Sequence, residues 1–282
     1  MTELPDHIIN IHGHLHKSDD IDELVRDWDT HNVRRFCCLC IGGPFGVDRG
    51  GEYFGADELL PWLMKYPDII VGFADVNVSK EPSPVWEIKK RKNQGFTGLK
   101  FILPAYPYND ERYFHIYEAA EQLGMPIVFH TGYVSNPPQG GRGLDIDSLR
   151  MHPGHFDRIA RAFPDLTLIG AHLGLPFSDI AQTMALSHAN VYFDICGGSG
   201  KLPHLSRLKR ALAPFPGADW DNPGENLSLG LFEKTVFGTD NPPAAIWIES
   251  SIEILAYLHI PTCTRELFWW KNAAKILGIN SL

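Results

Sequence analysis

The sequence predicts an α/β protein, folded as a (β/α)8 TIM barrel with extended loops on its C-terminal face. Apolar runs of strand length alternate with longer segments of helical period along the chain, as in βα units around a parallel sheet. There are eight such runs, and eight strands close this barrel. The 282 residues suit a fold that typically has about 250. No linker interrupts the alternation, so we expect one domain over residues 1–282.

The expected strands are short, and several connect to helices with clear ends. We expect strands at Ile8–His12, Val33–Ile41, Ile69–Asn77, Thr97–Ile102, Pro126–His130, Leu166–His172, Asn190–Ile195 and Thr235–Thr239. A helix over Ile21–His31 follows the acidic pair Asp19 and Asp20, which suits a helix N-terminus. Another helix, over Tyr113–Leu123, stops at Gly124.

Three connections exceed the two to six residues typical of α/β units. Each follows a strand, and in a (β/α)8 barrel those loops form the active-site face. They are Gly42–Ala56, Thr131–His152 and Gly197–Gly230, the last with a short helix expected around Leu205–Leu212. The rival fold, a doubly wound open sheet, usually shows a Gly-rich phosphate loop after its first strand, and no such pattern follows the first strand here.

Composition argues against several classes of function. A net charge of −9 without any run of Lys and Arg disfavours nucleic acid as a partner. The N-terminus lacks the pattern of a signal peptide, and no apolar stretch reaches about 18 residues, so we expect a cytoplasmic protein without a membrane partner. Three of the five cysteines, Cys37, Cys38 and Cys40, share one apolar run, and we expect buried, reduced thiols there.

The 13 histidines are the feature that points to chemistry. His12 and His14 are two residues apart at the end of the first strand, a spacing that places both imidazoles on one side. Polar residues also lie at or near the ends of other strands, among them Lys100, His130, His172 and Asp240. In a barrel these ends surround one pocket, so the residues would converge from distant parts of the chain.

This set suits an ion such as zinc, which accepts neutral imidazoles and a carboxylate and leaves a position open for water. The ion would make hydroxide available near neutral pH and polarise a bound carbonyl, while a neighbouring carboxylate or His takes the proton.

Other interpretations of these residues stay open. Asp240 can instead cap the helix that follows it, Asp194 competes as the acid, and Lys100 can be a solvated or paired lysine. Arg142 and Arg150 can bind a substrate carboxylate.

Five segments in this order resemble the amidohydrolase superfamily, in the branch that contains aminocarboxymuconate-semialdehyde decarboxylase and many metal-dependent hydrolases. They are Asn10-Ile11-His12-Gly13-His14, Gly98-Leu99-Lys100, Val128-Phe129-His130-Thr131-Gly132, Gly170-Ala171-His172-Leu173-Gly174 and Phe237-Gly238-Thr239-Asp240-Asn241-Pro242. One departure is Asn10, where several relatives have an acidic residue.

The resemblance implies a metal site and its residues. It implies His12, His14, His130 and Asp240 as metal ligands, with Asp240 also a proton acceptor. His172 would be an additional ligand or a catalytic residue. The metal would be Zn²⁺, or alternatively Mn²⁺ or another divalent ion, and mononuclear rather than binuclear. In binuclear relatives a carboxylated lysine bridges two metals, and Lys100 would be that residue. The resemblance also suggests a homodimer.

Two enzymatic hypotheses follow, both with a small-molecule substrate. The first is metal-dependent hydrolysis of an ester, lactone or amide. The second is non-oxidative decarboxylation of an aromatic or unsaturated carboxylic acid, with His172 and Asp240 handling protons and an arginine such as Arg150 binding the acid. A third hypothesis, a barrel that binds a ligand without catalysis, does not explain why so many potential ligands gather at strand ends.

Overall fold

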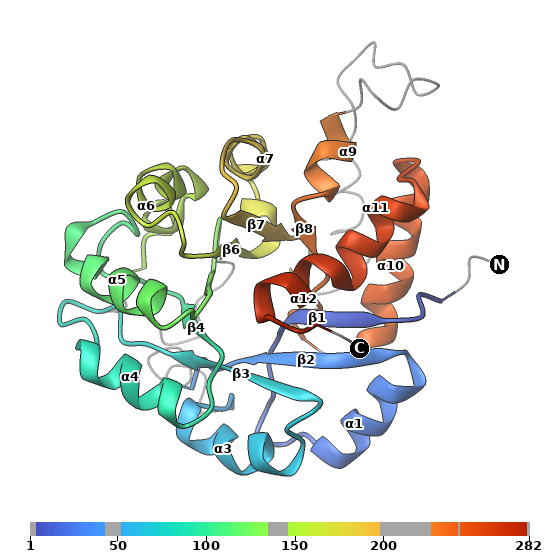
Figure 1. Cartoon of the computed structure of the whole chain (residues 1–282), viewed down its shortest axis with the longest axis horizontal. Coiled ribbons are helices and arrows are strands. Elements are labelled where there is room, and N and C mark those ends of the chain that lie inside the picture. Colours follow the sequence, from blue (N-terminus) through green and yellow to red (C-terminus); the bar gives the residue numbers. More distant parts are fainter. Residues whose placement is uncertain (1–3, 43–51, 135–145, 198–226, 242, 281–282) are drawn as a thin grey trace.

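The computed structural model shows eight parallel strands in one sheet, in the order of the chain, with helices around the outside (Figure 1). It describes residues 4–42, 52–134, 146–197, 227–241 and 243–280. The strands are β1 Ile8–Gly13, β2 Val33–Leu39, β3 Ile70–Asp75, β4 Gly98–Phe101, β5 Ile127–Phe129, β6 Leu168–Gly170, β7 Val191–Asp194 and β8 Thr235–Val236. The helices are α1 Ile21–Thr30, α3 Ala56–Lys65, α4 Val85–Asn93, α5 Phe114–Gln122, α6 Phe156–Ala162, α7 Ser178–Ser187, α9 Leu227–Phe232, α10 Ala244–Tyr257, α11 Thr262–Glu266 and α12 Asn272–Leu277.

Backbone hydrogen bonds between β1 and the segment after β8 close the sheet into a barrel. The N–H groups of Thr239 and Asp240 both donate to the carbonyl of His12, at 2.8 and 2.9 Å. The N–H of His14 donates in turn to the carbonyl of Asp240, at 2.9 Å. These contacts confirm the predicted (β/α)8 barrel.

Two apolar layers follow from the alternation of side chains along the strands. On β2, Cys37 and Leu39 point into the barrel, whereas Phe36 and Cys38 pack against the surrounding helices. The interior is almost wholly apolar, and α12 packs against it through Ala273 and Ala274. The cysteines of β2 are buried and free, as expected. With apolar side chains filling most of the interior, polar groups gather where the strands end.

Seven of the eight strands end earlier than the sequence predicts, whereas β1 extends one residue further, to Gly13. The sixth strand was expected to reach His172 but stops at Gly170, because Ala171–Gly174 form a 3₁₀ turn in which His172 and Leu173 have left-handed φ angles of 62° and 48°. His130 likewise follows β5 instead of lying in it. The helix expected at Leu205–Leu212 lies outside the described residues.

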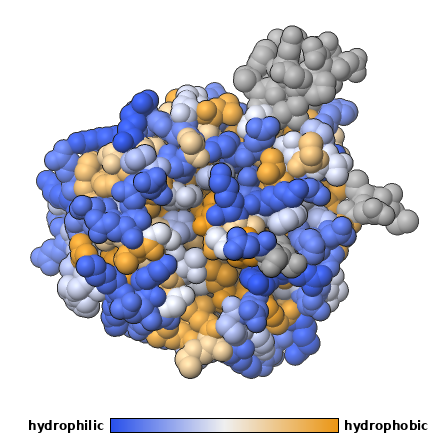
Figure 2. All heavy atoms as spheres, viewed as in Figure 1, coloured by the Kyte–Doolittle hydropathy of each residue, from blue (hydrophilic) through white to orange (hydrophobic). Residues whose placement is uncertain are grey.

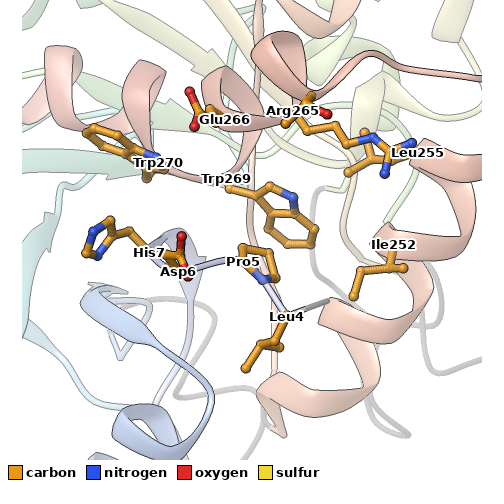
Figure 3. Close-up of a pocket in the computed structure, with 11 residues that line it drawn as sticks. Leu4, Pro5, Asp6, His7, Ile252, Leu255, Arg265, Glu266, Trp269 and Trp270 are labelled. Carbon is orange, nitrogen blue, oxygen red and sulfur yellow. The ribbon is translucent and has the colours of Figure 1, made fainter. Parts of the chain in front are cut away.

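Polar residues cover most of the face shown in Figure 2, between smaller apolar patches. Within the described ranges, no helix is long and apolar enough to cross a membrane. A cavity of about 360 Å³ lies at the amino end of β1, between the segment that precedes it and the helices α10 and α11 (Figure 3). Since His12 and His14 lie at the other end of β1, this cavity is separate from the site described next.

Packing between β6 and β7 gives a test of the fold. A Cβ atom on Gly170 would lie 2.1 Å from the Phe193 ring, which is fully buried. We therefore expect Gly170→Ala to lower the free energy of unfolding in urea by about 1–3 kcal/mol. The control Gly230→Ala on α9, where the nearest atom, on Leu186, is 3.4 Å away, should leave stability unchanged or raise it by up to about 1 kcal/mol. Equal stability of both variants would contradict this packing.

Candidate metal centre

Three acceptor atoms from β1 and the segment after β8 face one another. Nε2 of His12 lies 3.3 Å from Nε2 of His14. Oδ1 of Asp240 lies 3.5 Å from the first nitrogen and 3.6 Å from the second. The side chain of His12 is fully buried and that of Asp240 is 17% exposed, so the carboxylate borders solvent. The predicted convergence of these three residues is thus present.

In each imidazole, the hydrogen bond made by Nδ1 determines whether Nε2 carries a proton or a lone pair. Nδ1 of His12 lies 2.7 Å from a carboxylate oxygen of Asp194, and Nδ1 of His14 lies 2.7 Å from the carbonyl of Leu39. Both partners only accept, so each Nδ1 carries the proton. Burial lowers the pKa of both imidazoles well below the ordinary value, which keeps them neutral. Each Nε2 therefore presents a lone pair.

Two lone pairs and a carboxylate oxygen at these distances repel one another unless a cation lies between them. Neutral imidazole and carboxylate are ligands that divalent transition metals accept. The residues therefore fit a divalent metal, and the orientation of each ring agrees with that role.

A second group of metal-binding residue types lies beside the first, formed by His172, Asp194 and Cys196 around Nδ1 of His12. Nδ1 of His172 donates to the carbonyl of Cys196 at 2.8 Å. Burial raises the pKa of the Cys196 thiol well above its usual range, so it keeps its proton. His172, Asp194 and Cys196 are thus engaged in hydrogen bonds with one another and with His12. We therefore interpret them as a hydrogen-bond network that supports the first cluster.

His130 and Lys100 add two buried polar atoms without partners. Within the described part of the chain, neither Nε2 of His130 nor Nζ of Lys100 has a hydrogen-bond partner. The ring centroid of His130 lies 4.9 Å from that of His172. The centroid of His172 lies in turn 5.1 Å from that of His12. Burial lowers the pKa of Lys100 to about 8, although Asp194 and Asp240 oppose the shift. Lys100 is thus buried and has no hydrogen-bond partner among the described residues, which disfavours its interpretation as a solvated or paired lysine.

Hydrogen bonds from neighbouring backbone and side-chain groups hold His12, His14 and Asp240 in place. Asn10 accepts from the N–H of His12 at 3.1 Å and donates to the hydroxyl of Thr239 at 2.9 Å, so it ties β1 to the segment after β8. The interpretation of Asp240 as a helix cap is wrong, since α10 begins at Ala244 and no side chain caps it. Asp240 has a left-handed φ of 62°, which is uncommon for a residue other than glycine.

The two arginines expected at the site have different outcomes. Arg150 lies in a 3₁₀ turn, Ser148–Met151, in the long loop after β5. Its Nη1 donates to the carbonyl of Pro104 at 3.5 Å, and its Nε lies 3.9 Å from the carboxylate of Asp147. Arg142 lies outside the described residues. The part of Arg150 in substrate binding stays a prediction.

Sequence reasoning missed the supporting role of Asp194. We expected it only as a competitor for the acidic ligand, whereas it accepts the Nδ1 proton of His12 and is fully buried. A carboxylate at the end of an apolar strand was the available signal. It could not show which histidine the carboxylate contacts, because His12 lies 182 positions earlier in the chain.

A family model described as Amidohydrolase matches residues 46–279. None of the curated protein sequences compared with the chain matches it. Several solved structures share its fold. An uncharacterized TIM-barrel protein from Bordetella bronchiseptica has a TM-score of 0.66 at 18% identity, over 92% of this chain and 83% of its own.

Two further structures are similar along nearly their whole length. A Pseudomonas putida protein, whose proposed identity is a 2-pyrone-4,6-dicarboxylic acid hydrolase, has a TM-score of 0.64 at 14% identity, over 99% of this chain and 100% of its own. The 2,6-dihydroxybenzoate decarboxylase from Rhizobium has a TM-score of 0.62 at 14% identity, over 98% of this chain and 100% of its own. At these identities the likeness establishes the fold.

The buried ammonium of Lys100 gives a stability test in metal-free protein. Replacing an unpartnered buried charge with an apolar side chain of similar length should stabilise the fold, so Lys100→Met should raise the free energy of unfolding at pH 7 by about 1–4 kcal/mol. Between the folded pKa of about 8 and the ordinary value of 10.5, the unfolded wild-type chain keeps a proton that the folded chain has lost. Wild-type stability gains from this group as the pH rises through that window, and the advantage of the variant shrinks.

Urea unfolding of both proteins from pH 7 to pH 10 measures this difference. The control Lys90→Met replaces an exposed lysine on α4, and its difference from wild type should be small and constant with pH. A constant difference for Lys100→Met would show that its ammonium is not buried and charged in the folded protein.

Proposed function

The chain belongs to the amidohydrolase family and is an enzyme of that superfamily, and from this premise we propose a metal-dependent hydrolase that cleaves a small carbonyl substrate such as an ester, lactone or amide. The observation that carries the proposal is the group of three acceptors, Nε2 of His12, Nε2 of His14 and Oδ1 of Asp240, within 3.3–3.6 Å of one another. A divalent cation between these atoms would make the arrangement favourable in a buried site.

We propose His12, His14 and Asp240 as metal ligands, with His130 as the fourth. The unpartnered, buried Nε2 of His130 supports its inclusion, because a buried ring nitrogen without a partner is costly. Zn²⁺ fits a set of three imidazoles and one carboxylate best, with Mn²⁺ as the alternative. We favour one ion. A second ion would require carboxylated Lys100 as a bridge.

A divalent cation held by these residues supplies polarisation of the substrate carbonyl and activation of water. Asp240 is the partly exposed member of the trio, so its carboxylate can accept the proton of the attacking water. His172 holds its Nδ1 proton on the Cys196 carbonyl, so its Nε2 carries the lone pair that can exchange a proton with the substrate. Lys100 offers an unpaired ammonium to a negative oxygen of the substrate, and Arg150 is a candidate for binding a carboxylate.

The alternative is non-oxidative decarboxylation of an aromatic or unsaturated carboxylic acid. The likeness to 2,6-dihydroxybenzoate decarboxylase favours it, and so does the unpartnered ammonium of Lys100, which suits an anionic substrate. In that reaction His172 or Asp240 would give a proton to the carbon that loses carbon dioxide. Both reactions use the same residues, so the identity of the product distinguishes them.

An assay of products tests the proposal. The Zn²⁺-loaded enzyme is expected to hydrolyse members of an ester, lactone and amide panel, and Asp240→Asn should lower turnover by about 10²–10⁴-fold, because the proton acceptor is lost. Release of carbon dioxide from unsaturated or aromatic acids, with no hydrolysis of the panel, would establish the alternative instead. If the enzyme neither hydrolyses any member of the first panel nor decarboxylates any of the acids, both proposed reactions are contradicted.

Metal binding is tested separately by elemental analysis and thermal unfolding. We expect one Zn²⁺ per chain after reconstitution, and stabilisation of about 2.7 kcal/mol when free metal is 100 times its dissociation constant. His14→Ala should remove the metal-dependent part of this stabilisation. His115→Ala, which replaces a histidine hydrogen-bonded to the Ser83 carbonyl away from the cluster, should retain it. Equal metal-dependent stabilisation of both variants would contradict the ligand assignment.

A further inference from the structure

Asp194, at the carboxyl end of β7, accepts hydrogen bonds from three different residues. Oδ2 accepts from Nδ1 of His12 at 2.7 Å. Oδ1 accepts from the backbone N–H of His172 at 2.9 Å, from the backbone N–H of Cys196 at 3.1 Å and from the thiol of Cys196 at 3.1 Å. Both carboxylate oxygens are therefore engaged, and the side chain has no access to solvent.

The next residues of the same segment hold His172. Its Nδ1 donates to the carbonyl of Cys196 at 2.8 Å. Gly197 has a φ of 100°, and a Cβ atom there would lie 1.9 Å from that Nδ1. The ring of His172 occupies the space that any other side chain at position 197 would need. His172 itself has a left-handed backbone, which the hydrogen bond from its N–H to Asp194 stabilises.

We infer that the segment 194–197 aligns two histidines of the proposed site, the ligand His12 and the catalytic residue His172, and that Asp194 and Cys196 are positioning residues for metal binding. The inference rests on the proposed function. Asp194 fixes the Nδ1–H tautomer of His12, so that Nε2 faces His14 and Asp240. Cys196 keeps the carboxylate in place through its thiol and holds His172 through its carbonyl. Through these hydrogen bonds, one short segment holds the residues at the carboxyl ends of β1 and β6 in fixed positions.

Asparagine cannot replace Asp194 in this role. If its amide oxygen faces His12, its NH₂ group faces the three donors that Oδ1 now satisfies. If the amide is turned over, its NH₂ group faces Nδ1–H of His12 and favours the wrong tautomer. Either orientation places a donor against a donor. The loss should therefore appear as weaker metal binding, even where the fold is intact.

The test measures the Zn²⁺ dissociation constant by competition with a chromophoric chelator. Asp194→Asn should weaken Zn²⁺ binding about 10- to 100-fold. Cys196→Ser keeps a donor beside Asp194 and should bind as wild type does, whereas Cys196→Ala should bind more weakly than Cys196→Ser. The matched control Asp157→Asn removes a carboxylate on α6 that lies 3.0 Å from Nε2 of His188, which follows α7, and its affinity should equal that of wild type.

Thermal unfolding of the metal-free proteins and the visible spectrum of Co²⁺-loaded protein complete the test. A folded Asp194→Asn variant should show an altered Co²⁺ spectrum, because His12 is no longer aligned. Wild-type affinity and an unchanged spectrum in that variant would overturn the inference and leave the proposed function standing. If Asp194→Asn does not fold, equal affinities of Cys196→Ala and Cys196→Ser would overturn it. A wild-type chain that binds neither metal would remove the proposed function and the inference together.

Discussion

The structure depends on the hydrogen bonds that join the end of β1 to the segment after β8. The carbonyl of His12 accepts from two successive N–H groups, those of Thr239 and Asp240, and the N–H of His14 returns a bond to the carbonyl of Asp240. The same residues carry the three acceptor atoms of the candidate centre. A change of register at this junction would open the barrel and separate those acceptors, so closure of the sheet and assembly of the site are one event.

Burial concentrates the chemistry at one end of the barrel. The inward positions are almost all apolar, and α12 packs against them. Lys100 is an inward residue paired with Val128, a position where an apolar side chain would be more stable. An ammonium and a His130 nitrogen that have no hydrogen-bond partner in the described part of the chain destabilise the fold, as is common where residues are retained for function. Asp194 is the contrasting case, since four donor groups satisfy it.

Membership of the amidohydrolase family narrows the chemistry without choosing the substrate. Solved structures with this fold include a 2,6-dihydroxybenzoate decarboxylase and a protein proposed to be a 2-pyrone-4,6-dicarboxylic acid hydrolase, at 14% identity to the chain in each case. One barrel can serve both reactions, because the strand ends hold the reactive groups and the loops after them contact the substrate. In this chain, Arg150 lies in one such loop, close to Pro104 from another.

The sequence by itself determined the order of eight strands, the barrel they form and the residues that we propose as metal ligands. These follow from local patterns, namely apolar runs, the spacing of His12 and His14, and polar residues at strand ends. Tertiary structure alone decided which nitrogen of each ring faces the centre and that Asp240 is not a helix cap. It also decided that Lys100 is buried without a hydrogen-bond partner among the described residues, and that Asp194 supports His12. The physical reason is that these properties depend on contacts between residues far apart in the chain, 182 positions for His12 and Asp194 and 229 for Asn10 and Thr239.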